Sequence, residues 1–196
     1  MNKLQCLFLG YDENKTNLIK FLREKKIKVK NINDHLTLRD AEEADIVISF
    51  GYQKLIKKEV LKKLKRPAIN LHMSFLPYNR GSYPNYWSFI EETPKGITIH
   101  EIDEGADTGD IIFQKSFAFD LNNEKFSTFK KTYNFLFLEL EKLFIEKFAF
   151  ILGNNYKTKK QIGSFSDHKD SDLPKNFTDW DTNIIEHIKI INESDI

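Results

Sequence analysis

Short apolar runs alternate along the first part of the chain with stretches in which apolar residues recur at helical spacing. Continuous apolar runs are typical of strands buried on both faces of a parallel sheet. Strands of this kind are predicted at residues 4–9, 27–29, 45–50 and 68–71. Helices are predicted near 15–25 and 57–65, where apolar positions fall on one side. This alternation predicts an α/β fold with an open, mostly parallel twisted sheet and helices on both faces.

The second part of the chain has a different pattern. Residues 96–102 alternate as a half-buried strand does, and a further strand is predicted at 110–114 after a tight loop. A helix is predicted to begin at 86–91, and a long one follows to about residue 152. Later residues are polar and irregular, and only 184–191 indicate a helix. We therefore predict a main domain over residues 1–152 and a C-terminal extension, residues 153–196, that packs on the domain or on a partner subunit.

The composition narrows the classes of protein to consider. The chain carries 30 Lys and Arg against 29 Asp and Glu, a formal net charge of +1, so no global field draws it to nucleic acid or an anionic membrane. Cys6 is the only cysteine, which excludes an intramolecular disulfide and a cysteine-based zinc site. We expect no signal peptide, because the run Leu4 to Leu9 is too short for one, and no apolar segment of the given sequence reaches about 20 residues. We expect a soluble protein of the reducing cytoplasm, with no nucleic-acid or membrane partner.

Polar side chains stand at the end of one buried strand. Asn70 and His72 are two residues apart, so their side chains point to the same face. Ligands bind at this carboxyl edge in open α/β sheets, and two N–H donors aimed at one point suit a developing oxyanion. Asp107, in a loop bounded by glycines, is placed to orient the imidazole. Taken alone, a local hydrogen bond at a strand end and a turn are the simpler explanation of these residues.

The spacing of neighbouring residues changes that interpretation. Residues 70–81 read NLHMSFLPYNRG, and His100, Asp107 and Gly109 follow at fixed intervals. This arrangement resembles the 10-formyltetrahydrofolate-dependent formyltransferase family, whose motif is N-x-H-x-S-x-L-P-x-x-R-G followed by H-x-x-x-x-x-x-D-x-G. The resemblance extends over residues 1–150 and is dense over 67–114. It implies the Rossmann-like sheet of that family.

The resemblance also implies roles for individual residues. Asn70 and His72 would stabilise the oxyanion formed when an amine attacks the formyl carbon of 10-formyltetrahydrofolate. Asp107, through His72 or a bound water, would manage the proton that leaves the amine. No metal is expected. The pterin ring would contact two loops, chiefly through their backbone, at Phe50, Gly51, Tyr52, Ile102, Asp103, Glu104, Gly105 and Ala106.

Contacts to the acceptor substrate are predicted in the loop after residue 72. The predicted contact residues are Ser74, Arg80, Tyr83 and Asn85. Structural alternatives stay open for three of them: a loop hydrogen bond for Ser74, an ion pair under the loop for Arg80 and a cover over the core for Tyr83. His100 projects from a mixed strand face, and a structural role is the simpler interpretation for it.

The acceptor that the resemblance favours is the amino group of a nucleotide-linked sugar used for surface polysaccharide. Residues 77–88 look most like that branch. Enzymes that formylate glycinamide ribonucleotide resemble one another in a Gly/Ser-rich phosphate loop, where Asp12 and Glu13 here would repel phosphate. Methionyl-tRNA enzymes have a further domain and a basic surface, and the family's deformylases have an amino-terminal domain; we expect neither here. The glycinamide ribonucleotide acceptor, hydrolysis of the donor, a non-catalytic folate- or nucleotide-binding relative and a homodimer remain alternatives.

Overall fold

The structure, a computed structural model, describes residues 3–175, 177 and 179–194. It divides into two compact units, each built from three separate stretches of chain. Unit 1 consists of Met1–His72, Ile99–Phe113 and Glu141–Gln161, and unit 2 of Met73–Thr98, Gln114–Leu140 and Ile162–Ile196. The boundary at residues 152 and 153 that the sequence indicates is a different division, and it stays a prediction.

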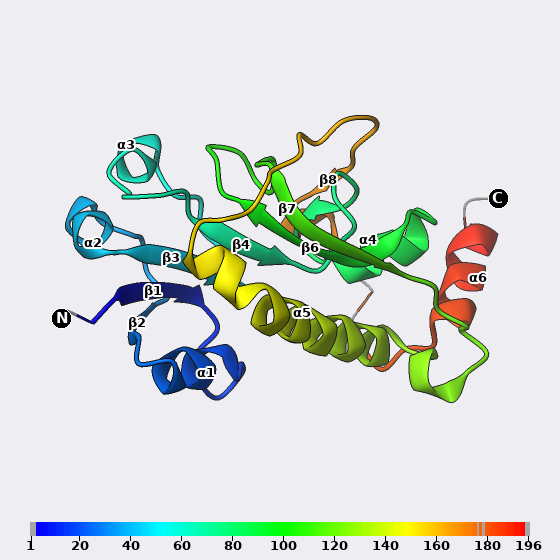
Figure 1. Ribbon diagram of the computed structural model, residues 1–196. Helices are drawn as coiled ribbons and strands as arrows, with labels where there is room; N and C mark the ends of the chain where they lie inside the picture. Colours follow the sequence, from blue (N-terminus) through cyan, green and yellow to red (C-terminus); the bar gives the residue numbers. More distant parts are fainter. Residues whose placement is uncertain (1–2, 176, 178, 195–196) are drawn as a thin grey trace. The chain divides into compact units, whose positions relative to one another are not determined.

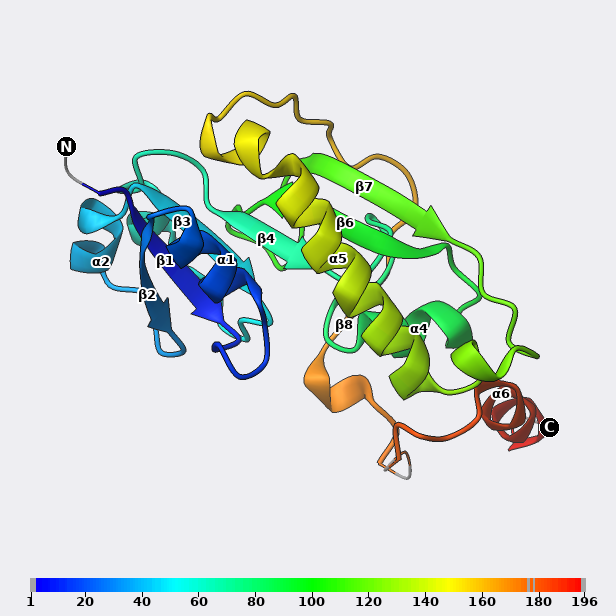
Figure 2. The same cartoon turned by 60° about the horizontal axis from the view of Figure 1, so that its bottom comes forward.

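Six strands form one mixed, mostly parallel sheet in the order β2-β1-β3-β4-β6-β7. Figure 2 shows β2, β1, β3 and β4 following one another across the sheet. Each predicted strand is present, with ends that differ by a few residues. Their bounds are β1 Gln5–Gly10, β2 Lys28–Ile32, β3 Ile46–Phe50, β4 Ile69–His72, β6 Lys95–Glu101 and β7 Ile111–Phe117.

The parallel strands end together at one edge of the sheet. β1 pairs with β2 and β3, and β3 with β4, all in parallel. Gly10 is in register with Phe50, and Phe50 with Leu71. On the far side of β4, the N–H of Ile102 donates to the carbonyl of Ala68 over 2.8 Å. The end of β6 therefore lies beside the start of β4, and Asn70 lies against His100, with 3.2 Å between Nδ2 and Nε2.

Helices cover both faces of the unit 1 sheet, as predicted (Figure 1). On one face, Leu7 and Val47 belong to the same buried cluster as Ala41 and Val60, from two short helices. On the other, Phe21 packs edge to face on Phe148 at 5.0 Å between ring centroids. The helices are α1 (Leu18–Glu24), α2 (Leu38–Glu43), α3 (Lys58–Leu61) and the end of α5 (Phe129–Leu152).

Two of these helices differ from the expectation. α2 was not predicted, although Thr37 and Asp40 form a capping box that stabilises its start. The helix predicted at 57–65 is confirmed only over Lys58–Leu61, and turns follow. Pro67 restricts the residue before it to extended backbone, so a helix could not continue into β4.

Unit 2 is built around aromatic side chains. Its buried cluster consists of Tyr86, Phe89, Phe129, Phe177 and Ile184. A two-stranded parallel sheet joins Arg80 and Gly81 to Asp167 and His168. Its elements include β5 (Arg80–Gly81), α4 (Pro84–Ile90), η1 (Glu124–Phe126), β8 (Asp167–His168), η2 (Asp170–Asp172), α6 (Ile184–Ser194) and the start of α5. In the described part of the chain, no helix is both long and apolar enough to cross a bilayer.

Candidate active site

The loop that carries Asp107 is held in a tight, defined shape. Asp107 itself has a φ of 53°, a left-handed conformation that costs a non-glycine residue about 1–3 kcal/mol. A Cβ at Gly109 would lie 1.9 Å from the carbonyl oxygen of Glu101, so only glycine lets the loop return so closely to β6. Asp103 accepts hydrogen bonds from the N–H of Gly105 and the hydroxyl of Thr108. The sharp bend predicted for this loop is confirmed.

Asn70, His72 and Asp107 converge within unit 1. The amide nitrogen of Asn70 donates to Oδ1 of Asp107 over 2.8 Å. The other carboxylate oxygen, Oδ2, lies 3.4 Å from Nδ1 of His72. The His72 and Asp107 side chains are only 7% and 14% exposed, so bulk water screens their contact little. One carboxylate thus bridges an amide and an imidazole that the strand presents on the same face.

His100 joins this group, which the sequence interpretation did not expect. Its Nε2 lies 3.2 Å from Oδ1 of Asp107 and 3.2 Å from the amide nitrogen of Asn70. Its Nδ1 lies 2.7 Å from the carbonyl oxygen of Glu101. The ring is 2% exposed and stands edge to face against His72, with 6.2 Å between centroids. The sequence signal that could have placed His100 here is strand alternation, because His100 and Ile102 are two residues apart and their side chains point to the same face.

Gln161 is a second residue that the sequence analysis missed. Its amide nitrogen donates to the carbonyl oxygens of Asp107 and Gly109, over 2.8 and 2.7 Å. Lys159 pairs with Ile111 just before it, which brings this part of the chain along the start of β7. Gln161 therefore closes the Asp107 loop from outside. No local sequence signal marks it, because its partners are backbone carbonyls more than fifty residues away.

Removing this contact is expected to loosen the Asp107 carboxylate. We predict that Gln161→Ala lowers kcat by about 10-fold while KM changes little, since a small misplacement of a catalytic group is costly. Steady-state kinetics of the variant will measure this. Lys160→Ala is the matched control, because Lys160 pairs with the neighbouring Asp110 at 2.9 Å through an ammonium group that is largely exposed. Equal rates for both variants would show that Gln161 does not position the loop.

The first loop predicted to contact the pterin is partly covered by the protein itself. The Phe50 side chain is buried, and its carbonyl accepts the N–H of Tyr11 over 2.9 Å. The Tyr11 ring lies directly against Gly51, whose φ is 70°. The Tyr52 hydroxyl donates to the carbonyl of Asp34 over 2.8 Å. The predicted backbone contacts to a ligand here stay a prediction.

Gly51 should not tolerate a side chain. A Cβ there would lie 2.3 Å from the Tyr11 ring, and the left-handed backbone adds strain. We predict that Gly51→Ala lowers the free energy of unfolding by about 2 kcal/mol, measured by urea unfolding. In a Tyr11→Ala background, Gly51→Ala should lower the free energy of unfolding by less than it does in the wild-type background, because the clash with the ring is gone. Strict additivity would contradict the steric explanation.

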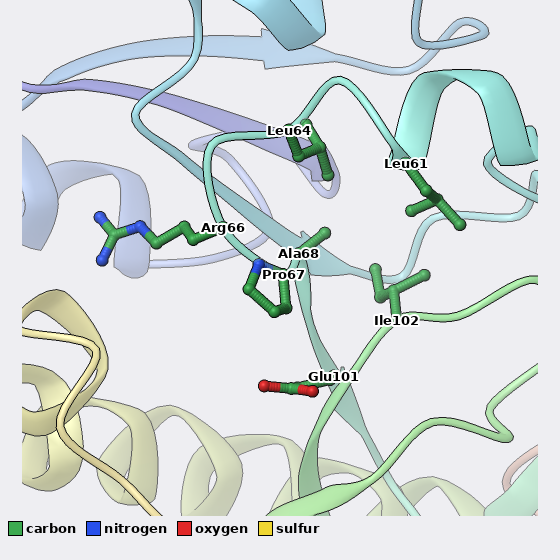
Figure 3. A pocket seen from close by; sticks show the side chains of 7 residues that line it. All are labelled: Leu61, Leu64, Arg66, Pro67, Ala68, Glu101 and Ile102. Atoms are coloured by element: carbon green, nitrogen blue, oxygen red, sulfur yellow. The ribbon is translucent and has the colours of Figure 1, made fainter.

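The second predicted loop borders a pocket of about 350 Å3 (Figure 3). Ala68 precedes Asn70 by two residues and Ile102 follows His100 by two, so their side chains share the face of the candidate cluster. In Figure 3 the aliphatic side chains of Leu61, Ala68 and Ile102 lie on one side, and Arg66 extends away on the other. The lining consists of Leu61, Leu64, Arg66, Pro67, Ala68, Glu101 and Ile102. Of the predicted pterin contacts, the pocket includes Ile102.

Polar and charged side chains at the rim of this pocket form hydrogen bonds with other residues of unit 1. The Arg66 guanidinium donates to the carbonyls of Asp45 and Leu152, both over 2.7 Å, and burial lowers its pKa. The Tyr156 hydroxyl donates to Glu101 over 3.2 Å. Burial and the neighbouring Glu101 charge raise the pKa of Tyr156 to about 12, so it stays a neutral donor at physiological pH. The rest of the predicted loop is exposed at Asp103 and Glu104, and Glu104 pairs with Lys58 at 2.7 Å.

The four predicted acceptor contacts belong to unit 2, and the side chains of Arg80, Tyr83 and Asn85 have partners there. Ser74 is buried; its backbone carbonyl accepts the Thr98 hydroxyl, and its own hydroxyl has no hydrogen-bond partner among the described residues. The Arg80 guanidinium lies 4.7 Å from the ring of Phe165, and the Tyr83 hydroxyl donates to Asp170 over 2.6 Å. Asn85 is 4% exposed and donates to the carbonyl of Phe129 and the hydroxyl of Thr132. An ion pair of Arg80 with Asp167 at 3.9 Å matches the structural alternative for that residue, and the acceptor contacts of all four residues stay a prediction.

A comparison with protein families matches residues 2–135 to the model described as "Formyl transferase". Among curated proteins, the GDP-perosamine N-formyltransferase of Brucella melitensis is 34% identical over 103 residues, which are 52% of this chain and 40% of that protein. The methionyl-tRNA formyltransferase of Thermodesulfovibrio yellowstonii is 44% identical over 80 residues, 40% of this chain and 25% of that protein. The matched segments thus span less than half the length of these relatives.

Solved structures extend the comparison to nearly the whole chain. The formyltransferase PseJ from Anoxybacillus kamchatkensis, in complex with UDP-4,6-dideoxy-4-formamido-L-AltNAc and tetrahydrofolate, is 37% identical with a TM-score of 0.84. That similarity covers 93% of this chain and 96% of PseJ. A sugar N-formyltransferase from Shewanella sp FDAARGOS_354 is 20% identical with a TM-score of 0.74, over 95% of this chain and 86% of that one, which shows a shared fold.

Proposed function

The chain belongs to the formyl transferase family, and from this premise we propose that it transfers a formyl group from 10-formyltetrahydrofolate to the primary amine of a nucleotide-linked amino sugar. The observation that carries the proposal is the convergence of Asn70, His72 and Asp107 in unit 1, with Asp107 between the other two. The similarity to PseJ over nearly the whole of both chains supports the acceptor class, because that structure holds a UDP-linked formamido sugar.

The donor's ring system is proposed to bind in the pocket beside the cluster. Its volume of about 350 Å3 is within the usual range for ligand pockets, and Leu61, Leu64 and Ile102 offer an apolar surface to a flat ring. The neighbouring loop, Asp103–Ala106, would supply backbone groups for the polar edge of the ring. Ala68 precedes Asn70 by two residues, which is about 6–7 Å along an extended chain, so a ligand bound against Ala68 can reach the cluster.

The chain's own groups divide the chemical work between them. 10-Formyltetrahydrofolate supplies the formyl group, which passes from its nitrogen to the amine of the acceptor. Asn70 offers an N–H from Nδ2, and His72 an N–H from Nε2, to the formyl oxygen as it gains negative charge. Asp107, through Oδ2 on Nδ1 of His72, orients that imidazole and receives the proton that the amine releases, directly or through a bound water. A proton returned by this group to the departing nitrogen completes the exchange.

The test is an assay of tetrahydrofolate release with purified protein and a panel of acceptors. The panel holds UDP-, dTDP- and GDP-linked amino sugars, glycinamide ribonucleotide, methionyl-tRNA and a sample without acceptor. We expect release that depends on an amino-sugar nucleotide, and a mass increase of that acceptor by one formyl group. Acceptor-independent release would mean hydrolysis, and binding of the folate without release in any sample would mean a non-catalytic relative. Either result would overturn the proposal.

A further inference from the structure

A basic segment, residues 54–66, borders the pocket proposed for the donor and is not used by the mechanism above. It holds seven of the chain's 30 Lys and Arg and one of its 29 Asp and Glu, so it carries +6 while the rest of the chain carries −5. Charge of one sign gathered in one place creates a local field even when the net charge is near zero. We propose that exposed lysines of this segment bind the carboxylates of the glutamyl tail of the folate donor. The inference deepens the proposed function and rests on it.

Ion pairs balance only part of the charge of this segment. Four of its lysines pair with acidic side chains elsewhere in unit 1 at 2.7–3.3 Å: Lys54 with Asp34, Lys58 with Glu104, Lys63 with Glu42 and Lys65 with Asp45. The Arg66 guanidinium is occupied by backbone carbonyls. Lys57 and Lys62 are exposed and form no ion pair with any described residue. These two ammonium groups are therefore available to an anion from outside the protein.

The single turn of α3 places these lysines next to the wall of the pocket. The N–H of Leu61 donates to the carbonyl of Lys57 over 3.0 Å. The N–H of Lys62 donates in the same way to the carbonyl of Lys58 over 3.1 Å. Positions three and four apart on a helix surface are neighbours, so Lys58 lies next to Leu61, which lines the pocket, and next to Lys62. The basic groups thus border the apolar wall proposed for the ring.

The same lysines border the loop that carries the candidate catalytic carboxylate. The ammonium of Lys58 lies 2.7 Å from Oε1 of Glu104. Glu104 is three residues before Asp107, which is at most about 11 Å along the chain. The tail of the donor continues from the nitrogen that carries the formyl group, so it begins at the cluster when that group is placed to react. A tail that leaves the cluster along this loop can therefore reach Lys58 and its neighbours.

Binding of the tail would exchange one partner of Lys58 for another. The side chains of Lys58 and Glu104 are both 58% exposed, and exposed ion pairs are weak. Each further glutamate of a γ-linked tail adds a carboxylate, and carboxylates on one chain reach several lysines at once. The affinity for the folate should therefore increase with the number of glutamates.

The test compares two tail lengths by equilibrium binding and needs no acceptor. Isothermal titration calorimetry measures the affinity of the purified protein for the monoglutamate and pentaglutamate forms of 5-formyltetrahydrofolate. We expect the pentaglutamate to bind about 10-fold more tightly at low ionic strength. This ratio of affinities should shrink as salt is added, because salt screens exposed charges.

Two variants with opposite expected effects assign the ratio to these side chains. In Lys57→Gln/Lys62→Gln the ratio should fall to less than about 3-fold, because the two unpaired ammonium groups are gone. In Glu104→Gln it should rise by about 3-fold, since Lys58 no longer has a carboxylate of the protein as its partner. The matched control is Lys20→Gln/Lys28→Gln, which removes two exposed lysines of unit 1 outside the segment and should keep the wild-type ratio.

Three results would overturn the inference. The first is equal affinity of the wild-type protein for the two forms, and the second is an unchanged ratio in Lys57→Gln/Lys62→Gln. The third is loss of the ratio on addition of UDP, which would assign the lysines to the diphosphate of the acceptor. Failure of the proposed function alone is recognised separately, because the ratios would be as expected but no acceptor would be formylated.

Discussion

Asp107→Asn is expected to lower kcat for formyl transfer by about 10²- to 10⁴-fold. The substitution keeps the size and one acceptor oxygen, so the contact with Asn70 can persist. It removes the negative charge that orients His72 and the site that receives the amine proton. His72→Ala should have an effect of the same order, because it removes an N–H donor to the oxyanion. Release of tetrahydrofolate with the best acceptor of the panel measures both variants.

The control for this prediction is Asp110→Asn. Asp110 belongs to the same loop, but its carboxylate pairs with Lys160 at 2.9 Å and contacts none of the cluster. We expect the Asp110→Asn variant to transfer formyl groups at the wild-type rate. The three variants Asp107→Asn, His72→Ala and Asp110→Asn should unfold at similar temperatures. If Asp107→Asn or His72→Ala were as active as wild type, the mechanism would be wrong, although family membership would be unaffected.

Asn70→Ala should lower kcat by about 10²- to 10³-fold, corresponding to the loss of one oxyanion donor worth roughly 3 kcal/mol. The donor is the second N–H of the amide, since the first donates to Oδ1 of Asp107. Binding of the folate should change by less than 3-fold, because the pocket and its loop are untouched. Stopped-flow single-turnover rates and equilibrium folate binding separate the two effects.

Asn134→Ala, on the exposed side of α5, is the matched asparagine control. This variant should change neither the single-turnover rate nor the affinity for the folate. A large loss of folate affinity in Asn70→Ala with an unchanged single-turnover rate would mean that Asn70 binds the donor and does not stabilise charge. That outcome would move the role of oxyanion donor to His72 alone.

The sequence was most informative where chemistry and backbone geometry are both local. The alternation of buried runs and helical periods predicted each strand of the six-stranded sheet, because hydrophobic patterning sets which faces are buried. Asn70 and His72 followed from strand periodicity, and the glycine-bounded bend at Asp107 from turn chemistry. α2 was the exception, because it was not predicted. The capping box at Thr37 and Asp40 is recognisable in the sequence, but the six residues of the helix include few apolar ones.

Contacts between distant segments could not be derived in this way. Gln161 meets the Asp107 loop through backbone carbonyls, which leave no trace in residue identity. The pairing of β5 with β8 joins residues about 87 positions apart, and the buried amide of Asn85 takes its partners from α5. A polar residue near a ligand and a polar residue that satisfies a buried carbonyl look alike in sequence, because both need only a donor at the right place.

By itself the sequence determined the strands of the sheet and singled out three candidate polar groups near one edge of it, since local periodicity and steric limits act through neighbouring residues. Only the tertiary structure decided that Asp107 lies between Asn70 and His72, that His100 faces the same carboxylate, and that Gln161 closes the loop. These decisions depend on hydrogen bonds whose direction is fixed by the packing of whole elements. Distances of about 3 Å between side chains from separate strands and loops are a property of that packing and are not encoded in any one segment.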